Sequence, residues 1–326
     1  MHKGIRSYSD ADVTARLDWS ALIKTMGAAF KRGAESPPRP HYDICVPGEP
    51  NGTLLLMPAW AEGHHIGLKT VTVYPGNADR SEPSVNAQYL LFSAVNGKLV
   101  AILEGGALTA RRTAAASALA SSYLARTDAK RLLIVGTGRL STNLAAAHAS
   151  VRKIDDVIVW GRNFTKAKAI AGELIAQGLP ARASDDLEVE ARAADIISCC
   201  TLSREPIIKG AWLKPGSHLD LVGAFTPQMA EADDEALHRG SIFVDTVEGA
   251  LQEAGELVQA IKRGAIDPKD VQASLFELTR NEHEGRRNDT EITVFKSVGC
   301  SLEDLAAAEL CVSRDWITHP NEIVAY

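Results

Sequence analysis

Two glycines, Gly136 and Gly138, follow the apolar run Leu132–Val135 and precede a stretch with helical spacing. Such a run suits a buried parallel strand. The glycines permit a tight turn close to a pyrophosphate, and the N-terminus of the following helix favours that anion. Ser141 replaces a third glycine and is still small enough for helix and strand to pack closely. The pattern predicts a dinucleotide site. Its expected residues are Gly136, Thr137, Gly138, Arg139, Leu140 and Ser141.

The next predicted strand, Val157–Trp160, ends where an acidic residue usually binds the hydroxyls of the adenine ribose. This chain instead has Gly161, Arg162 and Asn163 there. A guanidinium suits a ribose 2′-phosphate, so Arg162 favours NADPH, with NADH as the alternative. Two simpler interpretations stay open, namely a glycine turn without a ligand and an Arg162 that is only a solvated loop charge.

The composition is that of a globular protein with room for two domains, since 326 residues are 45% hydrophobic and 23% charged. The net charge of −6 gives no electrostatic reason to expect nucleic acid or an anionic membrane as partner. No stretch approaches the length of an apolar membrane span, and the first residues lack the apolar core of a signal peptide. We expect no membrane association.

The five cysteines show no ligand-like spacing, and a reducing cytoplasm is the expected setting. Cys199 and Cys200 lie in an apolar run that is typical of a strand interior. His64 and His65 are adjacent and would point apart, with no third ligand in view, so no metal is expected.

The first part of the chain predicts helices and an antiparallel sheet. A helix start at Ser9 and helical spacing over Trp19–Phe30 precede a proline-rich, extended connection at 36–40. Asn96 and Gly97 mark a hairpin turn. The expected strands are Thr53–Met57, Ile66–Tyr74, Gln88–Ser93 and Leu99–Glu104.

A long alanine-rich helix, Leu108–Arg126, leads into the first strand of the nucleotide motif and is the expected hinge between domains. Strands and helices then alternate, which indicates an α/β fold with a Rossmann-type doubly wound parallel sheet. Ser184 and Asp185 are the expected cap of one helix, and Ser301 that of the last, with Glu303 and Asp304 in its first turn. Arg286 and Arg287 belong to an expected cluster of solvated loop charges. The expected elements are the helix Ala167–Gln177 and the strands Ala181–Ala183, Asp195–Cys200, His218–Val222 and Ser241–Val244.

Several sequence blocks together resemble the ornithine cyclodeaminase/μ-crystallin family. They include Leu-Thr-Ala-Arg-Arg-Thr-Ala-Ala-Ala-Ser from Leu108, the Gly136 turn and His-Leu-Asp-Leu-Val-Gly-Ala-Phe-Thr-Pro from His218. Asp-Thr-Glu-Ile-Thr-Val-Phe-Lys-Ser-Val-Gly from Asp289 and the Met-Pro pair at 57–58, followed by Gly-Leu-Lys-Thr, complete the set. The blocks stand in family order and cover nearly the whole chain. Within the family, the resemblance is nearest to the reductases of Δ1-pyrroline-2-carboxylate.

The resemblance implies a homodimer whose subunits each have two domains. Residues 1–117 and 306–326 would form an α+β substrate-binding and dimerisation domain, and residues 118–305 the dinucleotide-binding Rossmann domain. Family members act on an α-amino or α-imino carboxylate beside a nicotinamide.

Three cationic residues are the candidates for holding the substrate. The planar fork of Arg112 suits a carboxylate, and the resemblance matches it to the family's substrate arginine. Strand alternation places Lys69 on an apolar face, where a lysine is costly without an anion. It matches a family lysine that contacts substrate and could also protonate a nitrogen. Arg39 matches an arginine that completes the cationic pocket. The bland alternatives are a solvated helix charge like Arg111 and a snorkelling surface lysine.

Further cofactor contacts are expected near the nicotinamide or its phosphates and at the carboxyl ends of the strands. Ser297 could equally be a hydroxyl that bonds only to backbone. These residues are Thr113, Thr201, Val222, Lys296 and Ser297.

The chain departs from the cyclodeaminases at Phe225, in the segment where they carry an aspartate credited with acid–base work. A phenyl ring cannot relay protons. The glutamate that some cyclodeaminases place before the Met-Pro pair is also replaced, by Leu55. Phe225 is therefore expected to line a reductase's substrate pocket.

The sequence predicts reduction of a cyclic imino acid, Δ1-pyrroline-2-carboxylate and its piperideine homologue, by NAD(P)H. Ornithine cyclodeaminase, alanine dehydrogenase and a non-catalytic binding protein like μ-crystallin are the alternatives. All share the fold.

Overall fold

The computed structural model describes residues 5–318, except for the side chains of Ala78 and residues 314–318, and it divides the chain into two compact units. Unit 1 contains the residues up to Arg112 and those from Cys300 onward, and unit 2 runs from Thr113 to Gly299. Both boundaries lie a few residues before the expected ones. The first falls inside helix α3 (Gly105–Leu124), and the second precedes α11 (Ser301–Thr318), whose first turn forms ion pairs inside unit 1.

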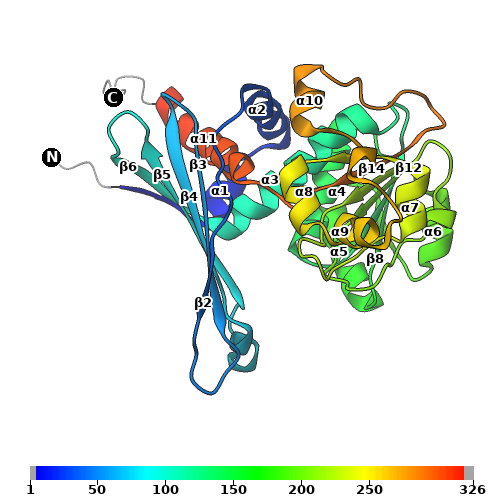
Figure 1. Cartoon of the computed structure of the whole chain (residues 1–326), viewed down its shortest axis with the longest axis horizontal. Helices are drawn as coiled ribbons and strands as arrows, with labels where there is room; N and C mark the ends of the chain where they lie inside the picture. Colours follow the sequence, from blue (N-terminus) through cyan, green and yellow to red (C-terminus); the bar gives the residue numbers. More distant parts are fainter. Residues whose placement is uncertain (1–4, 319–326) are drawn as a thin grey trace. The chain divides into compact units, whose positions relative to one another are not determined.

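Unit 2 is built on an eight-stranded sheet of order β13-β12-β14-β11-β10-β7-β8-β9, with all neighbouring strands parallel. β7 (Arg131–Val135) lies between β8 (Asp156–Trp160) and β10 (Ile196–Cys199), so the chain winds outward from β7 in both directions. The expected doubly wound α/β fold is confirmed (Figure 1). The other strands are β9 (Ala181–Ser184), β11 (His218–Leu221), β12 (Gly240–Val244), β13 (Val271–Ser274) and β14 (Ile292–Lys296).

The inner strands β10, β11 and β14 are buried at every residue because both faces of the sheet are covered, and the run Leu132–Val135 of β7 is completely buried. The helix cap was expected at Ser184 and Asp185, but the capping residue of the helix that begins at Leu187 is Asp186, whose side chain accepts the N–H of Val189. The helices of this unit are α4 (Arg139–Val151), α5 (Phe164–Ala176), α6 (Leu187–Ala193), α7 (Asp234–Arg239), α8 (Val247–Glu253), α9 (Gly255–Arg263) and α10 (Leu275–Arg280), with short 3-10 turns η2 (Gly210–Trp212) and η3 (Pro268–Asp270).

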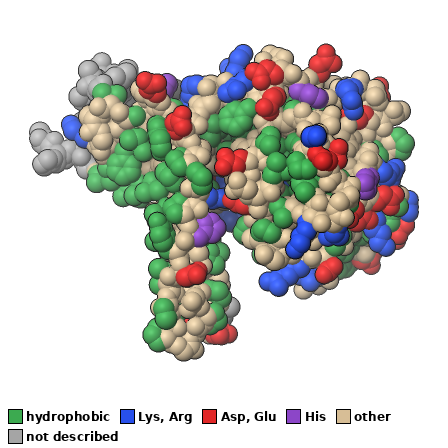
Figure 2. All heavy atoms as spheres, viewed as in Figure 1, with side chains coloured by type: hydrophobic (Ala, Val, Ile, Leu, Met, Phe, Trp, Pro, Cys, Tyr) green, Lys and Arg blue, Asp and Glu red, His purple; other side chains and the backbone are tan. Residues whose placement is uncertain are grey.

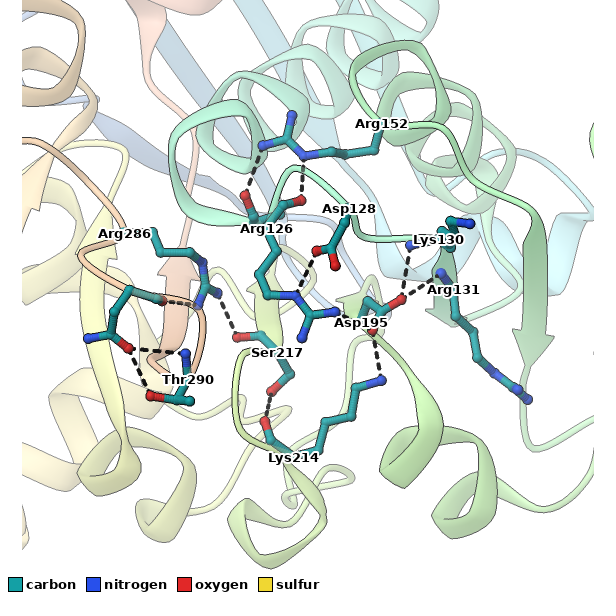
Figure 3. A network of polar contacts seen from close by, with 12 residues as sticks. Arg126, Asp128, Lys130, Arg131, Arg152, Asp195, Lys214, Ser217, Arg286 and Thr290 are labelled. Carbon is teal, nitrogen blue, oxygen red and sulfur yellow. Dashed lines mark hydrogen bonds and ion pairs between the residues drawn. The ribbon is translucent and has the colours of Figure 1, made fainter.

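Charged side chains bind backbone groups at the N-terminal ends of the strands of this sheet (Figure 3). Asp195 accepts the N–H groups of Lys130 and Arg131 at 2.9 and 3.0 Å, and its Oδ1 lies 2.7 Å from Lys214 Nζ. Arg286 donates to the carbonyls of Leu124, Ser217, Asn288 and Glu291 and to the hydroxyl of Thr293. The expectation that Arg286 is a solvated charge is therefore wrong, because the backbone carbonyls at this edge need its five donors.

Unit 1 contains a six-stranded sheet of order β1-β6-β5-β4-β3-β2. It is antiparallel as expected except at one edge, where β1 pairs parallel to β6. Helix α11 packs on β3, β4 and α2, and so covers one face of the sheet. The elements are β1 (Arg6–Tyr8), α1 (Asp10–Arg16), α2 (Trp19–Arg32), β2 (His41–Ile44), β3 (Gly52–Trp60), β4 (His65–Val73), η1 (Pro75–Arg80), β5 (Val85–Ser93) and β6 (Leu99–Glu104).

The helix ends of unit 1 follow the sequence closely. Ser9 caps α1 in a reciprocal capping box with Asp12. Helix α11 begins at Ser301, so this residue lies in the first turn rather than before it as expected. Across residues 5–318, no helix combines the length and apolar character needed to cross a membrane.

Candidate functional site

The glycine turn of unit 2 leaves room for a ligand at the start of a long helix. Gly136 has φ of +141°, and a Cβ there would lie 2.7 Å from the sulfur of Cys200. Gly138 precedes α4, and a Cβ on it would meet nothing within 4 Å. Within the described chain no side chain caps this helix, so its first N–H groups can bind an anion. The cradle fits a dinucleotide pyrophosphate.

The turns after β7 and β8 lie against each other. A Cβ on Gly161 would come within 2.5 Å of the Thr137 methyl group, so a larger residue here would force the Thr137 side chain to shift. Arg162 follows directly and its side chain is exposed. Ser141 is completely buried, with Oγ 3.5 Å from Cys200 Sγ, which agrees with its expected role as the small residue between helix and strand.

The other residues that are expected to contact the cofactor are less exposed than Arg162. Thr113 and Val222 are buried, and Thr201 hydrogen bonds to Glu231 through both its N–H and its hydroxyl. Lys296 is completely buried and pairs with Glu256 at 3.0 Å. Ser297 donates to Asp245, which also accepts the N–H groups of Val298 and Gly299. In this structure the side chains of Lys296 and Ser297 therefore bind buried acidic residues inside unit 2.

A second cluster, in unit 1, joins two buried cations to two buried carboxylates. Lys69 Nζ on β4 lies 2.7 Å from Oδ2 of Asp304, and Arg112 Nε on α3 lies 3.0 Å from Oδ1 of the same residue. The NH1 group of Arg112 is 2.7 Å from Glu303 Oε2. Both carboxylate side chains are 0% exposed, and those of Lys69 and Arg112 only 3% and 6%. We call these four residues the ionic cluster.

The ionic cluster shifts the acidity of its members. Burial lowers the pKa of Lys69 to about 8, with Asp304 acting against the shift and Arg112 and Arg39 adding to it. Burial also acts to lower the pKa of Arg112, but Asp304 and Glu303 outweigh it and raise that pKa. The charge of Arg39 is also felt by Lys69. A buried guanidinium and a buried ammonium held in fixed positions are suited to bind an anionic ligand.

Sequence reasoning missed three residues of this region. Glu303 and Asp304 were expected only as acids that complement the helix dipole, because no local signal links them to cations 191 and 235 residues away in the sequence. Tyr89 pairs with Lys69 across the strands and is completely buried. Among the described atoms its hydroxyl has no hydrogen-bond partner, and it occupies the space left by the missing side chain of Gly67.

The remaining candidates lie elsewhere. Phe225 follows β11 in unit 2 and is 47% exposed, so its ring is available to a ligand. Arg111 differs from the solvated charge we expected, because its guanidinium stacks 4.3 Å from the centre of the Trp19 ring. His65 lies 3.0 Å from Glu309, and no group of three metal-ligating side chains occurs among the described residues.

Comparison with known proteins places the chain in a family. The sequence model of the ornithine cyclodeaminase/mu-crystallin family matches residues 4–316. The chain belongs to this family, and with its dinucleotide-binding Rossmann fold it is an oxidoreductase.

Relatives within the family have named activities. A Δ1-pyrroline-2-carboxylate reductase of Paracoccus denitrificans is 39% identical to this chain. The alignment covers 93% of this chain and 94% of the reductase. The structure of the Thermococcus litoralis reductase of that name, in complex with NADH and L-proline, has a TM-score of 0.89 at 33% identity and covers 97% of this chain and 98% of the other. An archaeal alanine dehydrogenase dimer with bound NAD has a TM-score of 0.87 at 29% identity, with 96% and 97% covered.

The ionic cluster predicts an unusually acidic lysine whose pKa depends on Asp304. We expect Lys69 to titrate near pH 8, and at a lower pH in Asp304→Asn, because that variant loses the charge that favours the ammonium. ¹³C NMR of the lysine ε-carbons, assigned with Lys69→Met, measures the midpoint. Glu303→Gln is the control, since Glu303 pairs with Arg112 and should move the midpoint less. An ordinary lysine pKa of 10.5 in the wild-type protein would contradict this arrangement.

Proposed function

We propose that the protein reduces a cyclic imino acid with NAD(P)H, converting Δ1-pyrroline-2-carboxylate to L-proline and Δ1-piperideine-2-carboxylate to L-pipecolate. The observation that carries this proposal is the pair of buried cations, Lys69 and Arg112, held by Glu303 and Asp304. The named relatives support the substrate class, since one binds NADH and L-proline.

The carboxylate of the substrate is the group that the cations would bind. The Arg112 guanidinium is oriented by Glu303 and Asp304 through its NH1 and Nε groups. Its planar fork suits a carboxylate, and Lys69 and Arg39 add positive charge. Fixing this end of a small ring also fixes its C2 and its nitrogen, which is a large part of what catalysis requires.

Reduction of the C=N bond adds a hydride to C2 and a proton to nitrogen. When bound, the reduced nicotinamide supplies the hydride. Lys69, whose pKa is lowered to about 8, is suited to give up a proton near neutral pH, directly or through a bound water. Asp304 accepts a hydrogen bond from Lys69 and so keeps the ammonium in place before the transfer.

Phe225 supports a reductase over a cyclodeaminase. Its hydrocarbon ring stands where cyclodeaminases are credited with an acid–base aspartate, and Leu55 stands on β3 in place of a glutamate. Neither side chain can accept or donate a proton.

A substrate panel tests the reaction directly. Purified protein is given each cyclic imino acid, ornithine, or pyruvate with ammonia, and oxidation of NADPH or NADH is followed by absorbance. We expect turnover of the imino acids, and we expect Arg112→Ala to raise KM on the order of a hundredfold by removing a charged, bidentate contact. Arg111→Ala, which changes the next residue of α3, is the control and should keep KM near the wild-type value. Turnover of ornithine without turnover of the imino acids would reject the proposal.

We also propose NADPH as the preferred cofactor, on the basis of the exposed Arg162 beside the glycine turn. Arg162→Ala should weaken NADPH on the order of tenfold and leave NADH nearly unchanged, because only NADPH carries the 2′-phosphate. Titration of cofactor fluorescence measures both affinities. Lys153→Ala is a matched control, since this exposed lysine lies before the same strand, β8, that Arg162 follows. Equal losses for the two cofactors would refute the role of Arg162.

We propose further that the protein is a cytoplasmic homodimer. None of its five cysteines, all within the described residues, forms a disulfide bond, which suits a reducing compartment. The face of the unit 1 sheet opposite α11 carries a row of partly exposed apolar side chains across four strands, and Figure 2 shows hydrophobic surface over this unit. The row consists of Pro58, Leu68, Leu90 and Ile102. A second copy would cover it, as the dimeric relative suggests.

Sedimentation measures this association. The wild-type protein should have twice the chain mass of 34.9 kDa, and Leu68→Glu should shift it toward the monomer by placing a charge in the interface. Val189→Glu introduces the same charge at an exposed position of α6 and should remain dimeric. A wild-type monomer at micromolar concentration would contradict the proposal.

A further inference from the structure

Glu231 binds two loops of unit 2 at once. The residue lies between β11 and α7 and is completely buried. Its Oε1 accepts the N–H of Thr201 at 2.6 Å and the hydroxyl of Thr201 at 2.9 Å. Its Oε2 accepts the N–H groups of Gly223 and Ala224 at 2.8 and 3.2 Å. One carboxylate therefore satisfies four donors from the loops that follow β10 and β11.

These loops are in contact with each other and with the glycine turn. A Cβ on Gly223 would lie 2.1 Å from the Thr201 carbonyl oxygen, so the two loops touch through backbone. A Cβ on Gly136 would lie 2.9 Å from the carbonyl oxygen of Cys200, the residue before Thr201. By binding both loops, Glu231 therefore fixes their position relative to the turn at Gly136.

The strand order gives these loops a direction along the sheet edge. Arg162 follows β8, the pyrophosphate turn follows β7, and Thr201 and Gly223 follow β10 and β11. With the 2′-phosphate at Arg162, a dinucleotide that crosses β7 extends its nicotinamide half toward β10 and β11. The loops bound by Glu231 therefore lie on the nicotinamide side.

Charges behind Glu231 keep it in place. Its backbone N–H donates to Glu256 Oε1 at 2.7 Å, and the other oxygen of Glu256 lies 3.0 Å from Lys296 Nζ. All three side chains are buried. Burial and Glu256 raise the pKa of Glu231 to about 7, while Lys296 and the donors of Thr201 oppose the shift. Lys296 thus acts on the two loops indirectly, through Glu256 and Glu231.

We infer that Glu231 is a positioning residue that holds the loops after β10 and β11 in the arrangement that binds the nicotinamide half of the cofactor. The inference rests on the proposed function in assuming a nicotinamide dinucleotide. It does not depend on which substrate is reduced.

The test separates the two halves of the cofactor. In Glu231→Gln an amide NH₂ must face one of the two donor pairs, so one loop loses its acceptor. We expect the affinity for NADPH to fall on the order of tenfold. The affinity for adenosine 2′,5′-bisphosphate, which lacks the nicotinamide half, should stay within about twofold of the wild-type value. Calorimetric titration measures both on the full-length protein.

Asp195→Asn is the matched control, since Asp195 accepts two backbone N–H groups at the opposite end of β10. It should lower the melting temperature yet leave both affinities unchanged. If Glu231→Gln does not fold, Thr201→Val removes one of the four donors and should weaken NADPH alone by a smaller factor. Equal losses for NADPH and the bisphosphate, or no loss for either, would overturn the inference. A wild-type protein that binds neither would instead refute the proposed cofactor.

Discussion

The structure of unit 1 depends on neutralising two buried cations. An unpaired cation away from water is so costly that a lysine would deprotonate, and an arginine, which stays charged, would destabilise the fold. Asp304 pairs with both Lys69 and Arg112, and Glu303 adds a second contact to Arg112. These partners are separated from the cations by 235 and 191 residues of sequence. The end of the chain therefore returns to unit 1, which explains why that unit is discontinuous.

Pairing of this kind orients the cations without saturating them. Asp304 divides its two oxygens between Lys69 and Arg112, so neither cation receives a whole carboxylate from it. The charge of Arg39 also acts on Lys69. A buried site of this composition is suited to a small anion, and its walls are held by β4, α3 and α11 rather than by loops.

In unit 2, charged side chains bind backbone groups at both ends of the strands of one parallel sheet. Asp195 and Arg286 satisfy backbone groups where the strands begin, and Glu231 does the same where they end. The turn at Gly136 lies on the second edge, where open α/β sheets bind their ligands. The hydrogen bonds of Glu231 join the loops that neighbour the nucleotide turn to one another.

The sequence predicted the regular parts of this architecture because their signals are local. Alternating apolar strands, the glycine turn and the capping box at Ser9 each lie within a few residues. Strands β1, β2 and β13 were missed. β1 has only three residues and β13 only four, and β2 (His41–Ile44) is exposed throughout and has no burial pattern. The partners of Lys69, Arg112 and Lys296 could not be predicted, because ion pairs between distant residues leave no periodic trace.

The central claim is that buried cations bind a carboxylate, and the most direct measurement compares two planar ligands. Pyrrole-2-carboxylate and its carboxamide have almost the same shape but differ in charge, and calorimetry gives the affinity of each in the presence of cofactor. The account predicts that the acid binds on the order of a hundredfold more tightly, because the amide presents N–H groups to charged donors. Equal affinity for the two ligands would contradict it.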